Sequence, residues 1–292
     1  MIVLSHPTGN ENVRQAALAL AEANLLREFW TTLNWNPHSI LDRKAPARLR
    51  ETLRRRAYPE IVRSRTRALP LREAVRLLLG AANVSLFSRH ERGALSIDAV
   101  SRALDRKVAA EIARTAKFTT VYGYEDCAAE TFAVAQRRGF ARLYDLPIGY
   151  WRAAQRIFAE EREREPEWAA TLTGTRDSEE KLARKDEELR LADRVVVAST
   201  FTKSSLAESP HQRPISVIAY GAPPIKEGEL LNCAGKLRIL FAGSLGQRKG
   251  LSYALRAVET LGPHCDLTLL GRKAANGCRV LDEAVRRHRW IP

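Results

Sequence analysis

The chain has 292 residues, 45% of them hydrophobic and 28% charged, which excludes a disordered chain and gives enough length for two globular domains. Its 48 Lys and Arg residues against 34 Asp and Glu residues leave a formal net charge of +14. This charge favours an anionic partner, such as nucleotide phosphates, an anionic membrane surface or nucleic acid, although an arginine-rich composition can also reflect a GC-rich genome.

Four cysteines are scattered along the chain: Cys127, Cys233, Cys265 and Cys278. They lack the short paired spacing of a zinc site or a disulfide framework, so we expect no metal site and a reducing compartment. No basic leader precedes the first apolar run, and no run reaches the roughly 18 apolar residues of a spanning helix. We therefore expect a cytoplasmic protein, with peripheral contact at the inner face of a membrane left open.

The first residues show the pattern that opens a doubly wound α/β domain. Residues 2–6 predict a strand, and residues 11–26 predict a helix with Asn10 as its N-cap. A second strand is expected over residues 27–35. Because ligands gather at the carboxyl ends of such strands, the short loop at 7–10 is a candidate binding loop.

Residues 43–76 are the most basic part of the chain and run into an amphipathic segment at 71–79. Such a region can lie on anionic lipid headgroups or hold an anionic ligand, and it can equally be a solvated helical face. Nucleic-acid binding has only the charge in its favour, because no zinc-finger spacing or aromatic RNA-binding signature is present. The cations are Arg43, Lys44, Arg48, Arg50, Arg54, Arg55, Arg56, Arg63, Arg65, Arg67, Arg72 and Arg76.

Helices are predicted over residues 96–116 and 127–138, with a strand over residues 117–122 between them. Glu125 and Asp126 follow this strand. A carboxylate at the end of a strand can orient a hydroxyl group or take its proton. The alternative is that Asp126 caps the next helix while Glu125 adds favourable charge to its dipole.

Residues 142–147 predict a further strand that places Asp145 near the same edge. Residues 151–191 are highly charged and predict exposed helices with local ion pairs, broken near Pro166 and residues 173–175. An apolar strand within 191–199, a helix start at 200–205 and a strand over 215–221 follow, and residues 222–235 predict a linker.

The segment LRILFAGSLGQRKG at residues 237–250 combines a buried strand, a glycine turn, two cations and the start of an amphipathic helix. Free N–H groups and the helix dipole attract an anion there, and Lys249 adds a full charge. It matches neither the P-loop nor the dinucleotide fingerprint. The alternative is an ordinary strand-to-helix turn with a solvated Arg248–Lys249 pair. One more strand at 265–272 and a helix at 279–288 follow.

The strand, glycine turn and Lys-Gly of this segment resemble the opening of the C-terminal domain in family-4 glycosyltransferases of the two-Rossmann B fold. The Ala-Asp before the strand at 194 and the Tyr-Gly before the linker resemble the same family. The resemblance implies an α/β protein with an N-terminal acceptor-side domain at 1–221, a linker at 222–235 and an incomplete donor-side domain at 236–292.

The same resemblance implies a retaining transfer of sugar from a nucleoside-diphosphate sugar, without metal or cofactor, to a glycan or lipid-linked acceptor in polysaccharide or glycolipid assembly. Lys249 and the glycine turn would bind the donor diphosphate. The family often carries an arginine where this chain has Ser244, so Arg248 is the candidate second cation. The donor-side residues are Gly243, Ser244, Arg248 and Lys249.

On the acceptor side, many relatives carry a histidine where this chain has Glu125, which makes Glu125 the catalytic candidate. The first loop and the strand at 142–147 supply the other acceptor-side candidates: His6, Gly9, Asn10 and Asp145. A structural role for His6 is the alternative.

Members of the family continue beyond the segment that corresponds to residue 292 and carry there a pair of glutamates at the donor site. We therefore expect an N-terminal portion of such an enzyme. The alternative is a non-catalytic form that binds an anionic glycan, a membrane surface or a protein partner.

Overall fold

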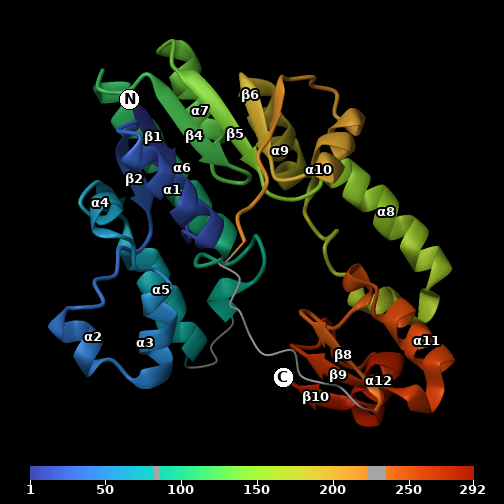
Figure 1. Cartoon of the computed structure of the whole chain (residues 1–292). Coiled ribbons are helices and arrows are strands. Elements are labelled where there is room, and N and C mark those ends of the chain that lie inside the picture. Colours follow the sequence, from blue (N-terminus) through green and yellow to red (C-terminus); the bar gives the residue numbers. More distant parts are fainter. Residues whose placement is uncertain (82–85, 223–234) are drawn as a thin grey trace. The chain divides into compact units, whose positions relative to one another are not determined.

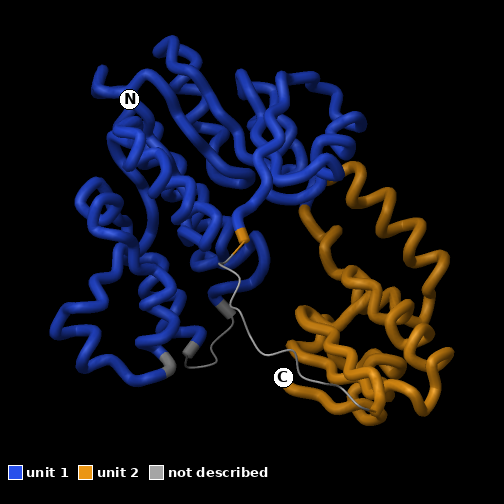
Figure 2. The backbone as a smooth tube through the Cα atoms, viewed as in Figure 1, with its two compact units in different colours: residues 1–150, 178–221 blue, residues 151–177, 222–292 orange. Residues whose placement is uncertain are grey.

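The computed structural model describes residues 1–81, 86–222 and 235–292 (Figure 1). Cys233 and nearly all of the predicted linker lie outside the described residues. The chain divides into two compact units, which are described separately: unit 1 comprises residues 1–150 and 178–221, and unit 2 comprises residues 151–177 and 222–292 (Figure 2). Residues 151–177, which the sequence placed in the N-terminal domain, thus group with unit 2.

Unit 1 is built on a seven-stranded parallel sheet with the order β3-β2-β1-β4-β5-β6-β7. The strand sequence changes direction between β1 and β4, so the carboxyl ends of these two strands form the switch point at which doubly wound sheets bind ligands. The strands are β1 (Ile2–Ser5), β2 (Leu26–Thr31), β3 (Thr66–Ala68), β4 (Thr120–Tyr124), β5 (Ala141–Leu146), β6 (Arg194–Val197) and β7 (Ile215–Val217).

The helices of unit 1 connect these parallel strands. They are α1 (Glu11–Glu22), α2 (Ile40–Lys44), α3 (Ala47–Arg54), α4 (Glu60–Arg63), α5 (Pro70–Ala81), η1 (Leu86–Ser88), α6 (Ile97–Arg114), α7 (Ala129–Arg137), α9 (Glu179–Leu191), α10 (Thr200–Ser205) and η3 (Leu206–Glu208). One face of α6 is buried, as Leu104 and Ile112 illustrate with exposures of 1% and 0%. Burial of such apolar faces against the sheet is what stabilises the layers.

Unit 2 contains a three-stranded parallel sheet with the order β10-β9-β8. Trp168, Leu245, Leu251, Leu269 and Leu281 belong to one buried core, which joins residues 151–177 to the C-terminal part of the chain. The elements are α8 (Trp151–Arg164), η2 (Pro166–Thr171), β8 (Leu237–Ala242), η4 (Gln247–Lys249), α11 (Leu251–Leu261), η5 (Gly262–His264), β9 (Cys265–Leu270), α12 (Arg279–Arg287) and β10 (Arg289–Ile291).

Two short strands were not predicted from the sequence: β3 (Thr66–Ala68) and β10 (Arg289–Ile291). Each has three residues, too few for a period-two pattern, and the residues of β10 are all exposed. Both are edge strands that exist because a longer neighbour offers its backbone groups for pairing.

The expectation that the charged helices over 151–191 are exposed is wrong for one face of α9. Lys181, Lys185 and Glu188 are buried, with exposures of 8%, 8% and 0%. Lys181 Nζ lies 2.8 Å from Asp98 Oδ1 of α6, so the inner face of α9 docks through charges. The alternation of Glu, Lys and Arg gave no sign of this, because Lys181 and Lys185 pair with Asp98 and Glu125, which lie far along the chain.

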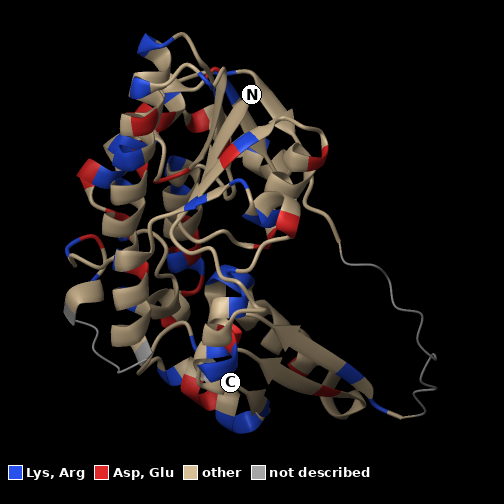
Figure 3. Cartoon of the chain, turned by 90° about the vertical axis from the view of Figure 1, so that its left-hand side faces the viewer, with Lys and Arg blue, Asp and Glu red and all other residues tan. Residues whose placement is uncertain are grey.

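Most cations of the basic segment 43–76 have hydrogen-bond or ion-pair partners inside unit 1. Arg56 pairs with the buried Glu73 over 2.9 Å, and Arg50 donates to two backbone carbonyl oxygens. Figure 3 shows Asp and Glu interspersed with Lys and Arg along the helices. Within the described ranges no helix is long and apolar enough to cross a membrane. Nine cations of the segment pair with a carboxylate or donate to a backbone carbonyl oxygen of a described residue: Arg50, Arg54, Arg55, Arg56, Arg63, Arg65, Arg67, Arg72 and Arg76.

Candidate functional site

Four side chains meet at the carboxyl edge of the unit 1 sheet, next to the switch point. His6 follows β1, Tyr122 and Tyr124 lie in β4, and Asp145 lies near the end of β5. The rings of His6 and Tyr124 meet edge to face with 4.9 Å between their centroids, and Tyr122 Oη donates to Asp145 Oδ2 over 2.8 Å. The structure therefore brings together two of the predicted acceptor-side residues, His6 and Asp145, through two tyrosines. We call these four residues the carboxyl-edge cluster.

His6 is held as a neutral ring. Its Nδ1 accepts hydrogen bonds from the backbone N–H groups of Thr8, over 3.1 Å, and Gly9, over 2.8 Å. A ring nitrogen that accepts from two donors carries no proton, so the proton of the neutral ring is on Nε2. Burial, together with the charge of Arg56, lowers the pKa of His6 from 6.5 to about 4. At neutral pH, His6 is therefore a hydrogen-bond donor through Nε2 and a poor base.

Asp145 is a buried carboxyl group, 9% exposed, that forms no ion pair with any described residue. Burial raises the pKa of Asp145 from 3.8 to about 6, while hydrogen bonds from Tyr122 and Tyr124 lower it partway. Burial, followed by the charge of Asp145, raises the pKa of both tyrosines, so they stay protonated donors. A carboxyl group that changes charge close to neutral pH is suited to accepting a proton.

Gly9 and Asn10 shape the loop between β1 and α1. Gly9 has a φ of +55°, and a Cβ atom on it would lie 1.9 Å from Tyr58 Oη, so this close turn requires glycine. Asn10 Oδ1 accepts from the N–H of Val13 over 3.1 Å, which confirms its predicted role as the N-cap of α1. Both residues therefore fix the loop that carries His6.

Glu125 lies directly after β4, but its carboxylate takes part in an ion pair. Glu125 Oε1 lies 3.5 Å from Lys185 Nζ, and both side chains are buried, with exposures of 8% and 9%. Lys185 comes from α9. A buried ion pair keeps its carboxylate charged and holds it in place, because breaking the pair would leave an unpaired buried charge.

The prediction that Asp126 might instead cap the helix after β4 is wrong. Asp126 has a φ of +69°, and its Oδ2 lies 3.5 Å from Lys181 Nζ. Two buried carboxylates from α9 and α6 take the first N–H groups of α7 in its place. Glu188 accepts from the N–H groups of Asp126, Ala128 and Ala129, and Asp105 accepts from those of Glu130 and Thr131.

In unit 2, the turn after β8 is fixed by neighbours from two parts of the chain. Gln247 donates through its backbone N–H to Thr171 Oγ1 over 2.9 Å and through Nε2 to Glu161 Oε1 over 2.6 Å. A Cβ atom on Gly246 would lie 2.7 Å from Ala274 Cβ, so the turn has room only for glycine there. The rigid neighbours therefore set the path of the backbone that leads into Arg248 and Lys249.

The turn leaves donors and charges available for an anion. Gly243, Ser244, Arg248 and Lys249 are exposed, and among the described residues neither cation has an ion-pair partner. The backbone N–H groups of Ser244 and Gly246 likewise find no acceptor in the described part of the chain. Since α11 begins just beyond, its dipole adds to the attraction. The four predicted donor-side residues are thus gathered in one exposed turn, the donor turn.

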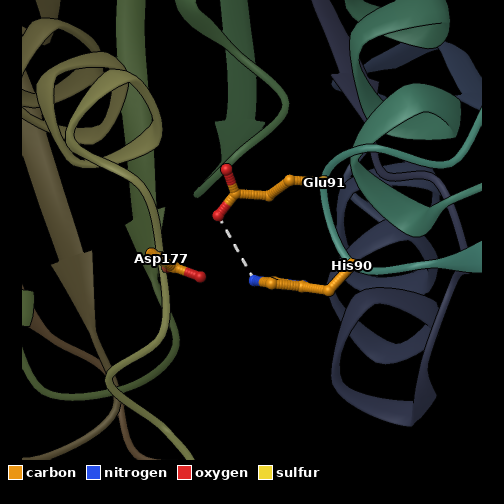
Figure 4. A group of neighbouring side chains, drawn as sticks. All are labelled: His90, Glu91 and Asp177. Atoms are coloured by element: carbon orange, nitrogen blue, oxygen red, sulfur yellow. Dashed lines mark ion pairs between the residues drawn. The ribbon is translucent and has the colours of Figure 1, made fainter.

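His90 and Glu91 form a second group of titratable residues in unit 1 (Figure 4). His90 Nε2 lies 3.3 Å from Glu91 Oε1, and Glu91 accepts from the backbone N–H of Ser178 over 2.8 Å and from the Ser178 hydroxyl. The group fastens the loop before α6 to the amino end of α9. Asp177, also labelled in Figure 4, belongs to unit 2.

Sequence reasoning missed Tyr122 as the partner of Asp145 and Gln247 as the anchor of the donor turn. The first had a usable signal, because two strands ending in Tyr and Asp can be neighbours in a parallel sheet. The second had none, since the partners of Gln247 lie 76 and 86 positions earlier in the chain.

Comparison with solved structures identifies the fold. UGT2 of Phytolacca americana, solved with UDP-2-fluoro-glucose and pterostilbene, is 14% identical, and the match covers 100% of this chain and 70% of that protein with a TM-score of 0.50. Alr3699/HepE of Anabaena, solved with UDP-glucose, is 12% identical, and the match covers 99% and 68% with a TM-score of 0.50. No protein-family model matches the chain, and no curated protein matches its sequence.

The chain therefore has the α/β fold of the B-type glycosyltransferases, with the seven-stranded sheet of unit 1 and the three-stranded sheet of unit 2. The predicted fold class is confirmed. At sequence identities of 12–14%, this similarity establishes the fold and nothing beyond it. Membership of family 4 stays a prediction.

Proposed function

We propose that the chain is a glycosyltransferase that moves a sugar from a nucleoside-diphosphate sugar to a hydroxyl group of a glycan or lipid-linked acceptor, with retention at the sugar carbon. The observation that carries this proposal is the donor turn, in which two exposed cations and two N–H groups without an acceptor among the described residues lie at the carboxyl end of β8. The two structures of the same fold named above were solved with UDP-sugars, which supports a diphosphate as the anion.

The donor turn would act on the leaving group. As the bond between sugar and diphosphate breaks, negative charge grows on the phosphate oxygens. A fixed cation and oriented N–H groups lower the energy of that state more than the energy of the bound donor, because the charge is larger there. In this proposal Lys249 supplies the main charge, Arg248 the second, and Gly243 and Ser244 the close backbone approach.

The test is to measure the affinity for UDP and UDP-glucose by calorimetry for the wild type and for Lys249→Ala. Loss of a charged contact to phosphate corresponds to about 1.5–3 kcal/mol, so we expect the Kd to rise by roughly 10- to 100-fold. Lys203→Ala, which removes an exposed lysine of unit 1, is the matched control and should bind like the wild type. Equal affinities of the Lys249→Ala variant and the wild type, or no binding of either nucleotide to the wild type, would contradict the proposal.

A further inference from the structure

We propose that Asp145 is the group that accepts the proton of the acceptor hydroxyl, and that Tyr122 positions its carboxylate for this step. This inference rests on the glycosyl transfer proposed above. Its residues all belong to unit 1, whereas the donor turn belongs to unit 2, so the failure of one proposal can be told from the failure of the other.

The position of Asp145 favours this role. It lies near the carboxyl end of β5, beside β4, one strand from the switch point between β1 and β4. This edge of a doubly wound sheet is where ligands bind. Asp145 keeps 9% of its surface exposed, and the partly exposed Tyr220 lies near enough for the charge of Asp145 to raise its pKa. Asp145 is therefore mostly buried, but part of its surface remains accessible to solvent.

The partners of Asp145 leave it able to take a proton. The titratable groups that face it are Tyr122 and Tyr124 of β4 and Tyr220 after β7, and all three are neutral at neutral pH. His6, which lies against Tyr124, is neutral too. No described cation pairs with Asp145. In the described part of the chain, the groups that donate to the carboxylate are tyrosine hydroxyls, and a base with such partners can gain a proton without breaking an ion pair.

Glu125 differs in this respect, although it follows the neighbouring strand. Its carboxylate lies 3.5 Å from Lys185 Nζ in a buried pair. Protonating Glu125 would remove the nearer of the two carboxylates beside the buried Lys185 and leave Asp126, at 3.9 Å, which is costly. Of the two carboxyl groups near this edge, Asp145 is thus the better proton acceptor. Glu125 is better suited to stay charged in its ion pair with Lys185.

The step balances without any further reactant. The acceptor oxygen forms a bond to the anomeric carbon of the donor sugar on the face from which the diphosphate departs, while the bond from that carbon to the diphosphate oxygen breaks, so the configuration is retained. The electron pair of the broken bond leaves with the nucleoside diphosphate. The hydroxyl proton passes to an Asp145 carboxylate oxygen and then to solvent. The products are the glycosylated acceptor and the nucleoside diphosphate.

The first experiment is to titrate the side-chain carboxyl carbons of ¹³C-labelled aspartate in the whole chain by NMR, with Asp145→Asn to assign the signal. We expect the Asp145 signal to titrate with a midpoint near 6. Tyr122→Phe removes the donor at 2.8 Å and should raise that midpoint by about one unit. Tyr144→Phe removes a buried hydroxyl that donates to Glu188 and should leave the midpoint unchanged. An Asp145 midpoint below 4, or equal effects of both tyrosine variants, would overturn the proposal.

The second experiment follows UDP release from UDP-glucose with glycerol as the hydroxyl probe, across pH 5–9. If the wild type turns over, Asp145→Asn should lower kcat by at least about 100-fold with little change in KM, and Tyr122→Phe should move the acidic limb of the profile upward. A kcat that survives in Asp145→Asn but is lost in Glu125→Gln would refute the assignment. If the wild type binds UDP but does not turn over, the carboxyl titration decides. If it does not bind UDP, the proposed function fails first.

Discussion

His6 and Asp145 lie at the same edge of one sheet, and burial moves their pKa values in opposite directions. The pKa of His6 falls from 6.5 to about 4, and that of Asp145 rises from 3.8 to about 6. In both cases the low-polarity surroundings favour the neutral form. The cluster can therefore stay uncharged in mildly acidic solution, and Asp145 becomes its single negative charge as the pH approaches neutrality.

A pH-dependent stability follows for His6. Between pH 6.5 and 4 the folded protein binds fewer protons at His6 than the unfolded chain, so this residue's contribution is complete above pH 6.5 and is lost as the pH falls. His6→Asn keeps an acceptor for the loop but does not titrate. We expect the wild type to lose up to about 3 kcal/mol more than this variant between pH 7 and pH 4, measured by urea unfolding.

The matched control for that measurement is His38→Asn, which replaces an exposed histidine of the same unit. Its curve should run parallel to that of the wild type. Asp145 contributes the opposite slope between pH 3.8 and 6 in every variant that retains it, so only differences between variants isolate His6. A His6→Asn curve parallel to the wild type would show that His6 is not buried as a neutral ring.

Among the elements, α9 is the one whose role differs most from its appearance in the sequence. It supplies Glu188, which accepts from the N–H groups of Asp126 and Ala128, just before α7, and of Ala129, the first residue of α7. Every one of these partners, and Tyr144 as well, is a donor to Glu188. The two oxygens of the charged carboxylate accept from all four donors, and because burial raises the pKa of Glu188 from 4.5 to about 8, this holds in full above pH 8.

Glu188→Gln should therefore destabilise unit 1. The amide places an NH₂ group against donors, which leaves buried groups unsatisfied and costs about 2–4 kcal/mol of unfolding free energy. The comparison is Glu187→Gln, the adjacent exposed glutamate that pairs with Arg190, for which we expect less than about 0.5 kcal/mol. Denaturant unfolding measures both. Similar losses in the two variants would contradict the capping role.

The elements also show which parts of the structure could be predicted from local sequence signals. The strand at the start of 237–250 and the helix start at 200–205 were predicted, and the structure has them as β8 (Leu237–Ala242) and α10 (Thr200–Ser205), because an apolar run and a serine before a helix are local signals. The expectation that this strand is buried is wrong, since the residues of β8 are exposed or half-buried. The donor turn was predicted as a unit for the same reason. The ion pair of Glu125 was not, because Lys185 comes from a helix some sixty positions later. An ion pair between residues far apart in the chain leaves no periodic pattern in the sequence from which it could be predicted.

At the scale of the whole molecule, the chain passes between the two units after residues 150, 177 and 221. The first passage brings α8 and η2 into unit 2, where Trp168 is 7% exposed in the core. Arg256 pairs with Glu165 over 2.6 Å, and Gln247 is held by Thr171 and Glu161. The donor turn thus depends on residues that precede β8 by many positions.

Trp168→Ala should destabilise unit 2 selectively. Removing a buried tryptophan costs about 3–5 kcal/mol, so hydrogen exchange of peptides from β8 and β9 should accelerate while peptides from β4 and β5 keep their protection. Trp290→Ala, at a tryptophan that is 36% exposed, is the control and should have the smaller effect. Equal acceleration in both units would show that the two cores unfold as one.

The early passage of residues 151–177 into unit 2 has a consequence for synthesis on the ribosome. These residues emerge before most of the core that they complete. At about 5–20 residues per second, the roughly 80 residues between Trp168 and Leu245 take about 4–16 s to translate. During that interval the indole of Trp168 has no native partner, and the sheet of unit 1 still waits for β6 and β7. The core of unit 2 can therefore form only after β8, α11 and β9 have been translated.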